Sequence, residues 1–520
     1  MTAAPNVRVR DSILIYAAAL ALYAIAALWL RSPGYMDAEY YWSTGRELAA
    51  GRGFQEPFLW NYLDDPVGIP HPSHQYWMPL ASIVAAIGTA VFGTSFRGAQ
   101  LPFVLIAAGL PVLTYALGWS LYGDRSKARW AALLAVFPGL FMPFLLTTDT
   151  FGLFGLLGGG ALTILAVSGS PGPRSAALAG VLVGLAHLAR ADGMLLWAPL
   201  LCAIASTRER RPRLLLAAVA GYAVVLTPWL ARNLVDTGHL WPTGGSRALW
   251  LLSYDETFSF PSAMLTSSRW WAVGIGALLR DRQAAMWTNA RSLLVVNGMA
   301  ILGFAMAAGA WRRRTSPLVR VSFVYLIVLW AVMSFVFPYA GARGGFFHSS
   351  AALMPLLFAL VPEGLEAFVG IGARWRGWSA ARATRLFAAS AVGLAAAFTT
   401  WALWSRITGD GAGAGWERNA RTYETVAGLL SDTGGPVAVN DAPGLYLATD
   451  RPTLAIPNGG PDTLRAVVDR YSAGWVVLEK NHPRALDGLY LNPEASDFLG
   501  SPIRFIDADG LPAYLFPVKR

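Results

Sequence analysis

The sequence predicts a polytopic α-helical membrane protein of about eleven transmembrane helices, with interfacial helices in its first outer loop and a small extracytoplasmic α/β domain at its C-terminus. Three observations lead to this fold class. Of the 520 residues, 55% are hydrophobic and only 14% are charged, whereas soluble domains carry about 25% charged residues. Long apolar runs recur up to about residue 404. Residues 406–520 then hold 25 of the 72 charged side chains.

This composition excludes a water-soluble enzyme for most of the length, because too few charged residues are present to cover a soluble surface. A disulfide scaffold is excluded as well, since Cys202 is the only cysteine. The net charge of +10 comes from short Arg clusters between apolar runs. Such clusters are topology signals, so we expect no nucleic-acid partner. We predict a transmembrane domain over 1–405 and a soluble α/β domain over 406–520.

Eleven apolar runs are long enough, or nearly long enough, to cross a bilayer. They lie at about 12–30, 99–121, 129–147, 150–168, 175–190, 193–206, 214–231, 292–311, 318–338, 347–369 and 384–404. The apolar stretch 78–93 is assigned to the membrane interface instead, because the loops then alternate cleanly in basicity.

The orientation follows from the basic residues in the short loops. Sixteen Lys and Arg residues fall in five loops on one side, at 125–129, 174, 208–213, 312–320 and 374–385, whereas the short loops between them carry only Arg190 and Arg343. Basic loops remain in the cytoplasm. We therefore predict a multi-pass protein of the cell (plasma) membrane with a cytoplasmic N-terminus and an extracytoplasmic C-terminal domain.

The first long outer loop, about 31–98, carries the most informative residues. It begins with Asp37-Ala-Glu39-Tyr40-Tyr41, and residues 38–50 are predicted to form a short amphipathic helix. It continues through His71-Pro-Ser-His74-Gln-Tyr76-Trp77 into the apolar stretch 78–93. Carboxylates, histidines and aromatic rings between lipid-facing segments suit a polar head group that is delivered on a lipid tail.

These motifs resemble the GT-C class of integral-membrane glycosyltransferases, and within it the protein O-mannosyltransferase and aminoarabinose-transferase branch. The Asp-x-Glu-Tyr-Tyr motif follows the first span, as in that family. Three further segments are similar to family motifs: His74-Gln-Tyr76-Trp77-Met-Pro79, Arg97-Gly-Ala-Gln-Leu-Pro102 and Thr147-Thr-Asp149. The family's Lys-Pro-Pro start is absent, and His71-Pro-Ser-His74 stands in its place.

The resemblance implies that a sugar moves, with inversion, from a polyprenyl-phosphate donor to an acceptor glycan, lipid or protein. Asp37 matches the family's catalytic aspartate and would accept the acceptor's proton; the alternative is that it only caps the 38–50 helix. Glu39 and Asp149 are further candidate acids, with roles at helix ends as their alternatives. Asp37 and Asp149 could share Mg²⁺ or Mn²⁺, whereas no His/Cys cluster supports zinc.

The donor phosphate needs cations or hydrogen-bond donors, and four outer residues are candidates: His74, Arg190, Arg343 and His348. The alternative for Arg190 is an ion pair with Asp192, and for the glycine-rich turn at 341–350 it is an Arg and a His at the interface. The candidate sugar contacts are Tyr40, Tyr41, Tyr76 and Trp77. Their alternative is an interfacial aromatic belt.

The C-terminal segment alternates between helical and strand patterns. Helices are predicted over 416–431 and 461–472, strands over 436–440, 452–457 and 475–480, and a closing hairpin near the end. This domain would bind the acceptor, cover the site or serve structure alone.

Two other function classes compete with glycosyl transfer. A transporter or flippase of lipid-linked glycans would need polar groups at mid-membrane and internal repeats, and the sequence shows neither. A scaffold or receptor would leave the placement of Asp37, Glu39 and Asp149 unexplained.

The orientation is testable with a reporter fused after Arg520. Because the basic loops define the cytoplasmic side, a reporter that is active only outside the cytoplasm should be active in this fusion. The orientation would be contradicted if the reporter were inactive and a tag after Arg520 were protected from protease added outside the cell.

Overall fold

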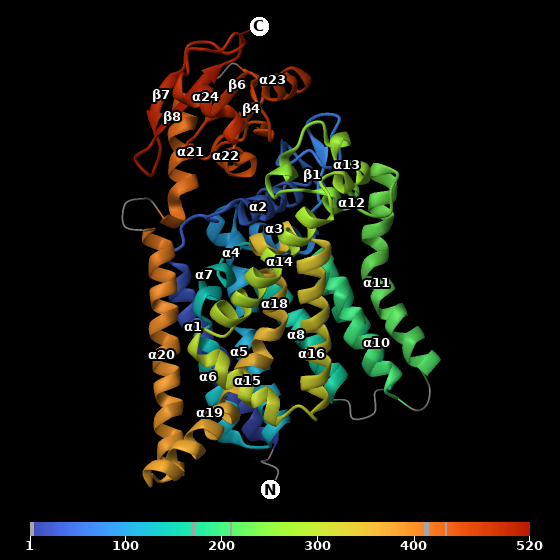
Figure 1. Ribbon diagram of the computed structural model, residues 1–520, viewed down its shortest axis with the longest axis vertical. Helices are drawn as coiled ribbons and strands as arrows, with labels where there is room; N and C mark the ends of the chain where they lie inside the picture. The colour runs from blue at the N-terminus through green and yellow to red at the C-terminus, as the bar shows by residue number, and fades with distance from the viewer. Residues whose placement is uncertain (1–4, 168–171, 208–210, 410–414, 432–433, 520) are drawn as a thin grey trace. The chain divides into compact units, whose positions relative to one another are not determined.

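The computed structural model describes residues 5–167, 172–207, 211–409, 415–431 and 434–519, and it is mostly helical (Figure 1). Residues 208–210 of a predicted basic loop lie outside this range. Contacts divide the chain into two compact units. Unit 1 comprises Met1–Trp29, Pro102–Ala231 and Asp281–Trp404, and unit 2 comprises Leu30–Leu101, Arg232–Arg280 and Ser405–Arg520. Unit 2 therefore combines the predicted C-terminal domain with the first outer loop and with Arg232–Arg280, whereas the predicted division at residue 405 separates these segments.

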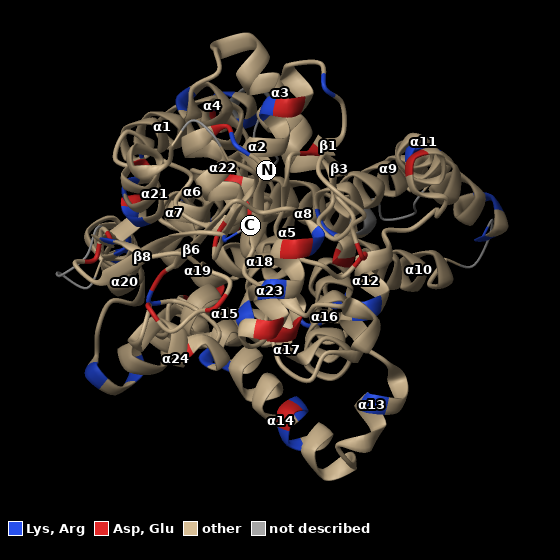
Figure 2. Cartoon of the chain, turned by 90° about the horizontal axis from the view of Figure 1, so that it is seen from above, with Lys and Arg blue, Asp and Glu red and all other residues tan. Residues whose placement is uncertain are grey.

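Uncharged residues make up most of the chain, as its 14% charged content requires (Figure 2). The longer helices of the first half are α1 (Pro5–Ala27), α4 (Phe96–Ala107), α5 (Gly109–Tyr122), α6 (Arg125–Val136), α8 (Phe151–Val167), α9 (Pro173–Ala189), α10 (Trp197–Ala205) and α11 (Arg211–Thr237). Those of the second half, up to residue 408, are α14 (Ile275–Ser292), α15 (Ile301–Arg312), α16 (Pro317–Ala331), α19 (Met354–Arg376) and α20 (Ala380–Thr408).

Six helices among the described residues are long and apolar enough to cross a membrane, or up to eight if two bent helix pairs each count as one span. The predicted spans at 150–168, 175–190 and 193–206 fall on α8, on α9 and on the segment Ala191–Ala205, none of which exceeds 17 residues. The predicted count of eleven is therefore not confirmed. Hydropathy does not distinguish a short apolar helix inside a bundle from one that crosses the bilayer.

Glycines allow α15 and α19 of unit 1 to approach closely. A Cβ on Gly309 would lie 2.2 Å from the carbonyl oxygen of Leu360, and one on Gly364 would lie 1.8 Å from that of Ala305. On each helix the two contacting residues are four positions apart and share one face: Ala305 and Gly309 on α15, and Leu360 and Gly364 on α19. Small residues at this spacing are typical of close helix contacts in membranes.

The first predicted outer loop folds into two helices and short strands of unit 2. Helix α2 (Met36–Ala49) and helix α3 (Leu80–Phe92) correspond to the helices predicted at 38–50 and 78–93. With 13 residues, α3 is shorter than the roughly 20 residues that a crossing needs. Strand β1 (Gln55–Glu56) pairs antiparallel with β3 (His71–Pro72).

A six-stranded mixed sheet forms the centre of unit 2, in the order β2-β5-β4-β6-β8-β7. Its strands are β2 (Phe58–Leu59), β4 (Val437–Val439), β5 (Thr453–Ala455), β6 (Trp475–Leu478), β7 (Ile503–Ile506) and β8 (Pro512–Pro517). The first four strands in spatial order run parallel, and β8 runs antiparallel to both of its neighbours, β6 and β7. Because β2 belongs to the first loop, that loop and the C-terminal segment share one sheet.

The helices of the C-terminal segment are α21 (Arg418–Leu429), α22 (Ala442–Thr449), α23 (Pro461–Arg470) and α24 (Asp487–Leu491). The patterns at 416–431 and 461–472 predict α21 and α23, whereas nothing in the sequence analysis predicts α22. Its N-cap is Asp441, whose side chain accepts a hydrogen bond from the backbone N–H of Gly444 at 3.1 Å. This is a favoured way to begin a helix.

Candidate functional site

The acids of the first loop lie at the beginning of α2. Asp37 is half-buried in the first turn, and the N-cap position belongs to Tyr35, whose side chain makes no capping hydrogen bond. The helix begins two residues earlier than predicted, so Asp37 is not its N-cap. At this first-turn position the charge of Asp37 interacts favourably with the helix dipole, and its role as the catalytic base stays a prediction.

Glu39 is buried, with 2% of its surface exposed, among residues of the C-terminal segment. The side-chain amide of Asn419 on α21 donates to Glu39 Oε2 at 3.2 Å and to Asp441 Oδ2 at 2.7 Å. One turn further along α21, the hydroxyl of Tyr423 donates to Glu479 Oε1 at 3.0 Å. Three carboxyl groups thus gather beneath one face of α21.

The strand order explains this gathering. Asp441 follows the carboxyl end of β4 by two residues, and Glu479 directly follows β6, a parallel neighbour of β4. Parallel strands end at the same edge of a sheet, where polar side chains tend to meet. The sequence contained this signal, since both strands were predicted. The predicted site residues nevertheless do not include Asp441, Glu479, Asn419 or Tyr423.

Burial decides the protonation of these acids. It raises the pKa of Glu39 well above its usual value, and the neighbouring Asp441 carboxyl adds to that shift. Burial likewise raises the pKa of Asp441. It also raises the pKa of Glu479 to about 7, although the Tyr423 hydrogen bond acts in the opposite direction. Carboxyl groups in contact in such surroundings retain protons that exposed ones would lose.

Of the four predicted aromatic sugar contacts, two lie in the core of unit 2. Tyr40 and Tyr41 are 1% and 2% exposed. Tyr76 and Trp77 are partly exposed, and the Trp77 ring stacks on Trp60 with 3.8 Å between the centroids. Tyr76 and Trp77 can therefore be reached by a ligand without rearrangement of the core, and the sugar-binding role of all four stays a prediction.

His74 is fully buried, which does not suit its predicted role at the donor phosphate. Its Nε2 lies 2.9 Å from Ser82 Oγ and its Nδ1 lies 2.7 Å from Ser73 Oγ. Burial lowers the pKa of His74 well below its usual value. The ring is therefore neutral, and its surroundings indicate a structural role for it.

The neighbouring His71 is held between two carboxylates. Its Nε2 lies 2.7 Å from Asp64 Oδ2, and its Nδ1 lies 3.3 Å from Glu56 Oε1. Burial alone would lower the pKa of His71, but these two hydrogen bonds raise it to about 10. The imidazolium is thus already neutralised within the loop.

In unit 1, the structure brings together two predicted residues that are far apart in the sequence. Asp149, 1% exposed, precedes α8, and its Oδ1 lies 3.9 Å from Nδ1 of His348. The His348 ring stacks on Phe151 with 3.9 Å between the centroids. A carboxylate oxygen and an imidazole nitrogen are ligand types for divalent cations.

Arg190 joins the same region of unit 1. Its Nε donates to Asp192 Oδ1 and to Ser349 Oγ, both at 3.1 Å, and Ser349 is the residue after His348. The ion pair with Asp192, which the sequence analysis kept as an alternative, is therefore present. Arg343 is exposed in the turn Gly341–Gly345.

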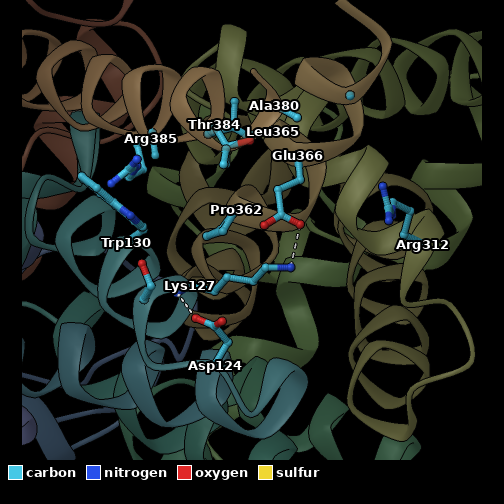
Figure 3. Close-up of a pocket in the computed structure, with 14 residues that line it drawn as sticks. Asp124, Lys127, Trp130, Arg312, Pro362, Leu365, Glu366, Ala380, Thr384 and Arg385 are labelled. Carbon is cyan, nitrogen blue, oxygen red and sulfur yellow. Dashed lines mark hydrogen bonds and ion pairs between the residues drawn. The ribbon is translucent and has the colours of Figure 1, made fainter. Parts of the chain in front are cut away.

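A cavity of about 600 Å³ also lies in unit 1 (Figure 3). Lys127 Nζ lies 2.6 Å from Glu366 Oε2 at its wall, and Arg385 from α20 reaches the same space. None of the predicted site residues lines this cavity. Its Lys and Arg residues belong to loops predicted to be cytoplasmic, and Glu366 lies near the predicted inner end of a span, so we do not assign the donor to it.

Comparison with known proteins supports the family resemblance. A family model described as dolichyl-phosphate-mannose-protein mannosyltransferase matches residues 71–231. A comparison with curated proteins finds no significant match.

Solved structures share the fold over almost the whole chain. ArnT from Cupriavidus metallidurans, bound to undecaprenyl phosphate, is similar with a TM-score of 0.57 and 15% identity, over 97% of both chains. The archaeal oligosaccharyltransferase AglB from Archaeoglobus fulgidus, in complex with an inhibitory peptide and a dolichol-phosphate, gives 0.56 and 14% identity, over 96% of this chain and 74% of its own. The fold is that of these membrane transferases, and the predicted resemblance is confirmed.

The raised pKa of Glu479 gives a testable pH dependence. The folded chain holds its proton up to about pH 7, whereas the unfolded chain releases it near the ordinary value of 4.5. Stability from this group therefore falls as the pH rises through that window. Compared with wild type, Glu479→Gln should unfold at the same temperature at pH 5 and about 1–3 °C higher at pH 8.

The matched control is Glu424→Gln, at an exposed position on α21, the helix whose Tyr423 donates to Glu479, and it should not shift the midpoint at either pH. A Glu479→Gln midpoint that follows wild type at both pH values would contradict the assigned pKa.

Proposed function

We propose that this chain is a membrane glycosyltransferase that moves a sugar from a polyprenyl-phosphate donor to an acceptor at the outer face of the membrane, with inversion at the anomeric carbon. The observation that carries the proposal is the fold shared with ArnT over 97% of both chains. The mannosyltransferase family match over residues 71–231 supports the same reaction class. The acceptor is a glycan, a lipid or a protein.

The ligands of the related structures support the donor class. ArnT was solved with undecaprenyl phosphate and AglB with a dolichol-phosphate, and another AglB structure holds an acceptor peptide. A lipid phosphate is common to the first two. We extend this chemistry to the present chain, whose first loop and apolar helices suit a membrane-borne donor.

We assign Asp37 as the group that accepts the proton of the acceptor hydroxyl. It is half-buried in the first turn of α2, where Tyr35 and not Asp37 occupies the N-cap position. A positioned carboxylate typically contributes 10²–10⁴ in rate as a general base. Asp149 is the second acid of the proposal, and we assign Glu39 a role at the site through its position on α2.

The leaving phosphate is assigned to Arg190, Arg343 and His348. The guanidinium of Arg190 is oriented by Asp192 and Ser349, and an oriented fork suits bidentate contacts to phosphate oxygens. These contacts would stabilise the charge that develops as the glycosidic bond breaks. His74 does not join this set, because its ring is fully buried between Ser73 and Ser82.

A divalent cation is compatible with the residues of unit 1, where Asp149 and His348 bring an oxygen and a nitrogen ligand together. When bound, such an ion would supply positive charge beside the leaving phosphate. An AglB structure holds zinc and sulfate. The sharing of Mg²⁺ or Mn²⁺ by Asp37 and Asp149 stays part of this proposal.

Eleven spans, the cytoplasmic N-terminus and the extracytoplasmic C-terminal segment also remain proposals, supported by the distribution of basic residues between the loops. A flippase is not favoured, since the matching family model is described as a mannosyltransferase and AglB as an oligosaccharyltransferase.

Replacing Asp37 by Asn tests its role as the base. Asn preserves the size of the side chain but cannot accept the proton, so sugar transfer should fall about 10²- to 10⁴-fold. Losing one first-turn charge should cost only about 0.3–1 kcal/mol of stability. Initial transfer rates and thermal midpoints on the same preparations measure both effects.

The matched control is Asp462→Asn, which makes the same change at the second residue of α23 and should leave the transfer rate at the wild-type value. Near-normal turnover in Asp37→Asn would remove Asp37 from this role.

Removal of metal tests the cation. If Asp37 and Asp149 share one, EDTA should abolish transfer and Mn²⁺ or Mg²⁺ should restore it, because the ion supplies charge at the phosphate. Full activity in the presence of the chelator would contradict a role for the cation, and the phosphate would then be stabilised by Arg190, Arg343 and His348 alone.

A further inference from the structure

Helix α2, which begins with Asp37, is enclosed on two sides within unit 2. On one side it meets α3: Thr44 Oγ1 lies 2.5 Å from Ser82 Oγ. At Gly45 the two helices are so close that an added Cβ would lie 2.8 Å from the Cβ of Ala85. These contacts fix the distance between α2 and α3.

The other side of α2 meets the C-terminal segment along its length. Glu39, Ser43 and Glu47 are spaced by four residues and so share one helical face. Ser43 Oγ donates to the carbonyl oxygen of Pro443 at 3.5 Å, and the Tyr446 hydroxyl donates to Glu47 Oε1 at 2.6 Å. Each turn of this face therefore has a polar partner on or beside α22.

Glu39 is the contact nearest to Asp37, and the C-terminal segment makes room for it. A Cβ on Gly444 would lie 3.1 Å from Glu39 Oε2 and 2.9 Å from a ring carbon of Tyr423. Asn419 then donates to Glu39 and Asp441 together. Two buried carboxyl groups in contact are unfavourable unless hydrogen bonds compensate for the lost water.

We infer that Asn419 is a positioning residue: by bridging Glu39 and Asp441 it fixes the first turn of α2, and through it Asp37, so that the C-terminal segment acts on the reaction without touching the substrate. This inference rests on the proposed function for its effect on rate. The structural part, that Asn419 holds α2 in place, stands on the contacts alone. A misplacement of about 1 Å in a reacting group can cost about 100-fold in rate.

The test uses the full-length protein in detergent or nanodiscs. Asn419→Ala leaves the two carboxyl groups without their shared donor, so kcat should fall about 10- to 100-fold while KM for the donor changes less than about twofold, because Asn419 is not assigned to donor binding. Hydrogen–deuterium exchange of the amides at 40–49 should become roughly tenfold faster. Thr425→Ala, on an exposed part of α21, is the control and should change neither.

Rescue distinguishes positioning from general destabilisation. Asp441→Asn keeps the cap of α22, since Asn caps about as well as Asp, and it supplies an amide next to Glu39. The double variant Asn419→Ala with Asp441→Asn should therefore recover most of the amide protection of α2 and most of kcat. If Ala at 419 prevents folding, Asn419→Ser, which keeps one donor, should give intermediate exchange.

Unchanged exchange of α2 in Asn419→Ala, or no recovery of protection in the double variant, would overturn the inference. The exchange measurement needs no substrate. If the wild-type protein transfers no sugar, the proposed function fails, and the exchange data still decide whether Asn419 positions α2.

Discussion

The hydrogen bonds that Asn419 donates to the buried carboxyl groups of Glu39 and Asp441 are the constraint on which unit 2 depends. They join the first loop to a segment that lies 380 residues later in the chain. Buried carboxyl groups are costly to leave without partners, so α2, α21 and the cap of α22 must be assembled together. The pairing of β2 with β5 adds a backbone connection between the same two segments. The loop that carries Asp37 is thus ordered by a sheet and by a polar network.

This arrangement separates the groups that carry the proposed chemistry from those that place them. Asp37 is half-buried at the beginning of α2, whereas Glu39, two residues later, is enclosed by protein. In unit 1, Arg190 is likewise oriented by Asp192 and Ser349. Oriented groups in low-dielectric surroundings stabilise developing charge more effectively than mobile ones in water.

Local patterns predicted the elements of unit 2 well. Period and turn residues gave α2, α3 and most of the C-terminal strands, because these signals reside in neighbouring residues. Strand β2 has only two residues and no local signal, so its place in the sheet could not be predicted. The count of eleven spans failed to be confirmed for a similar reason, since α8, α9 and α10 are apolar but short.

The candidate site was predictable in part. Motif position predicts Asp37, whose role stays a prediction. Asp149 and His348 are predicted at outer ends of spans, and the structure brings these two side chains together. The sequence could not reveal that His74 is buried against Ser73 and Ser82, because such burial depends on the packing of α3. The role of Asn419 depends on a contact between distant segments and has no sequence signal of its own.

The most direct measurement of the central claim is the product formed by purified wild-type protein from a synthetic polyprenyl-phosphate sugar, with the anomeric configuration determined by NMR. We expect sugar to leave the lipid phosphate and to appear on an acceptor with inverted configuration. A donor that remains intact with every acceptor class, or a product of retained configuration, would contradict the account.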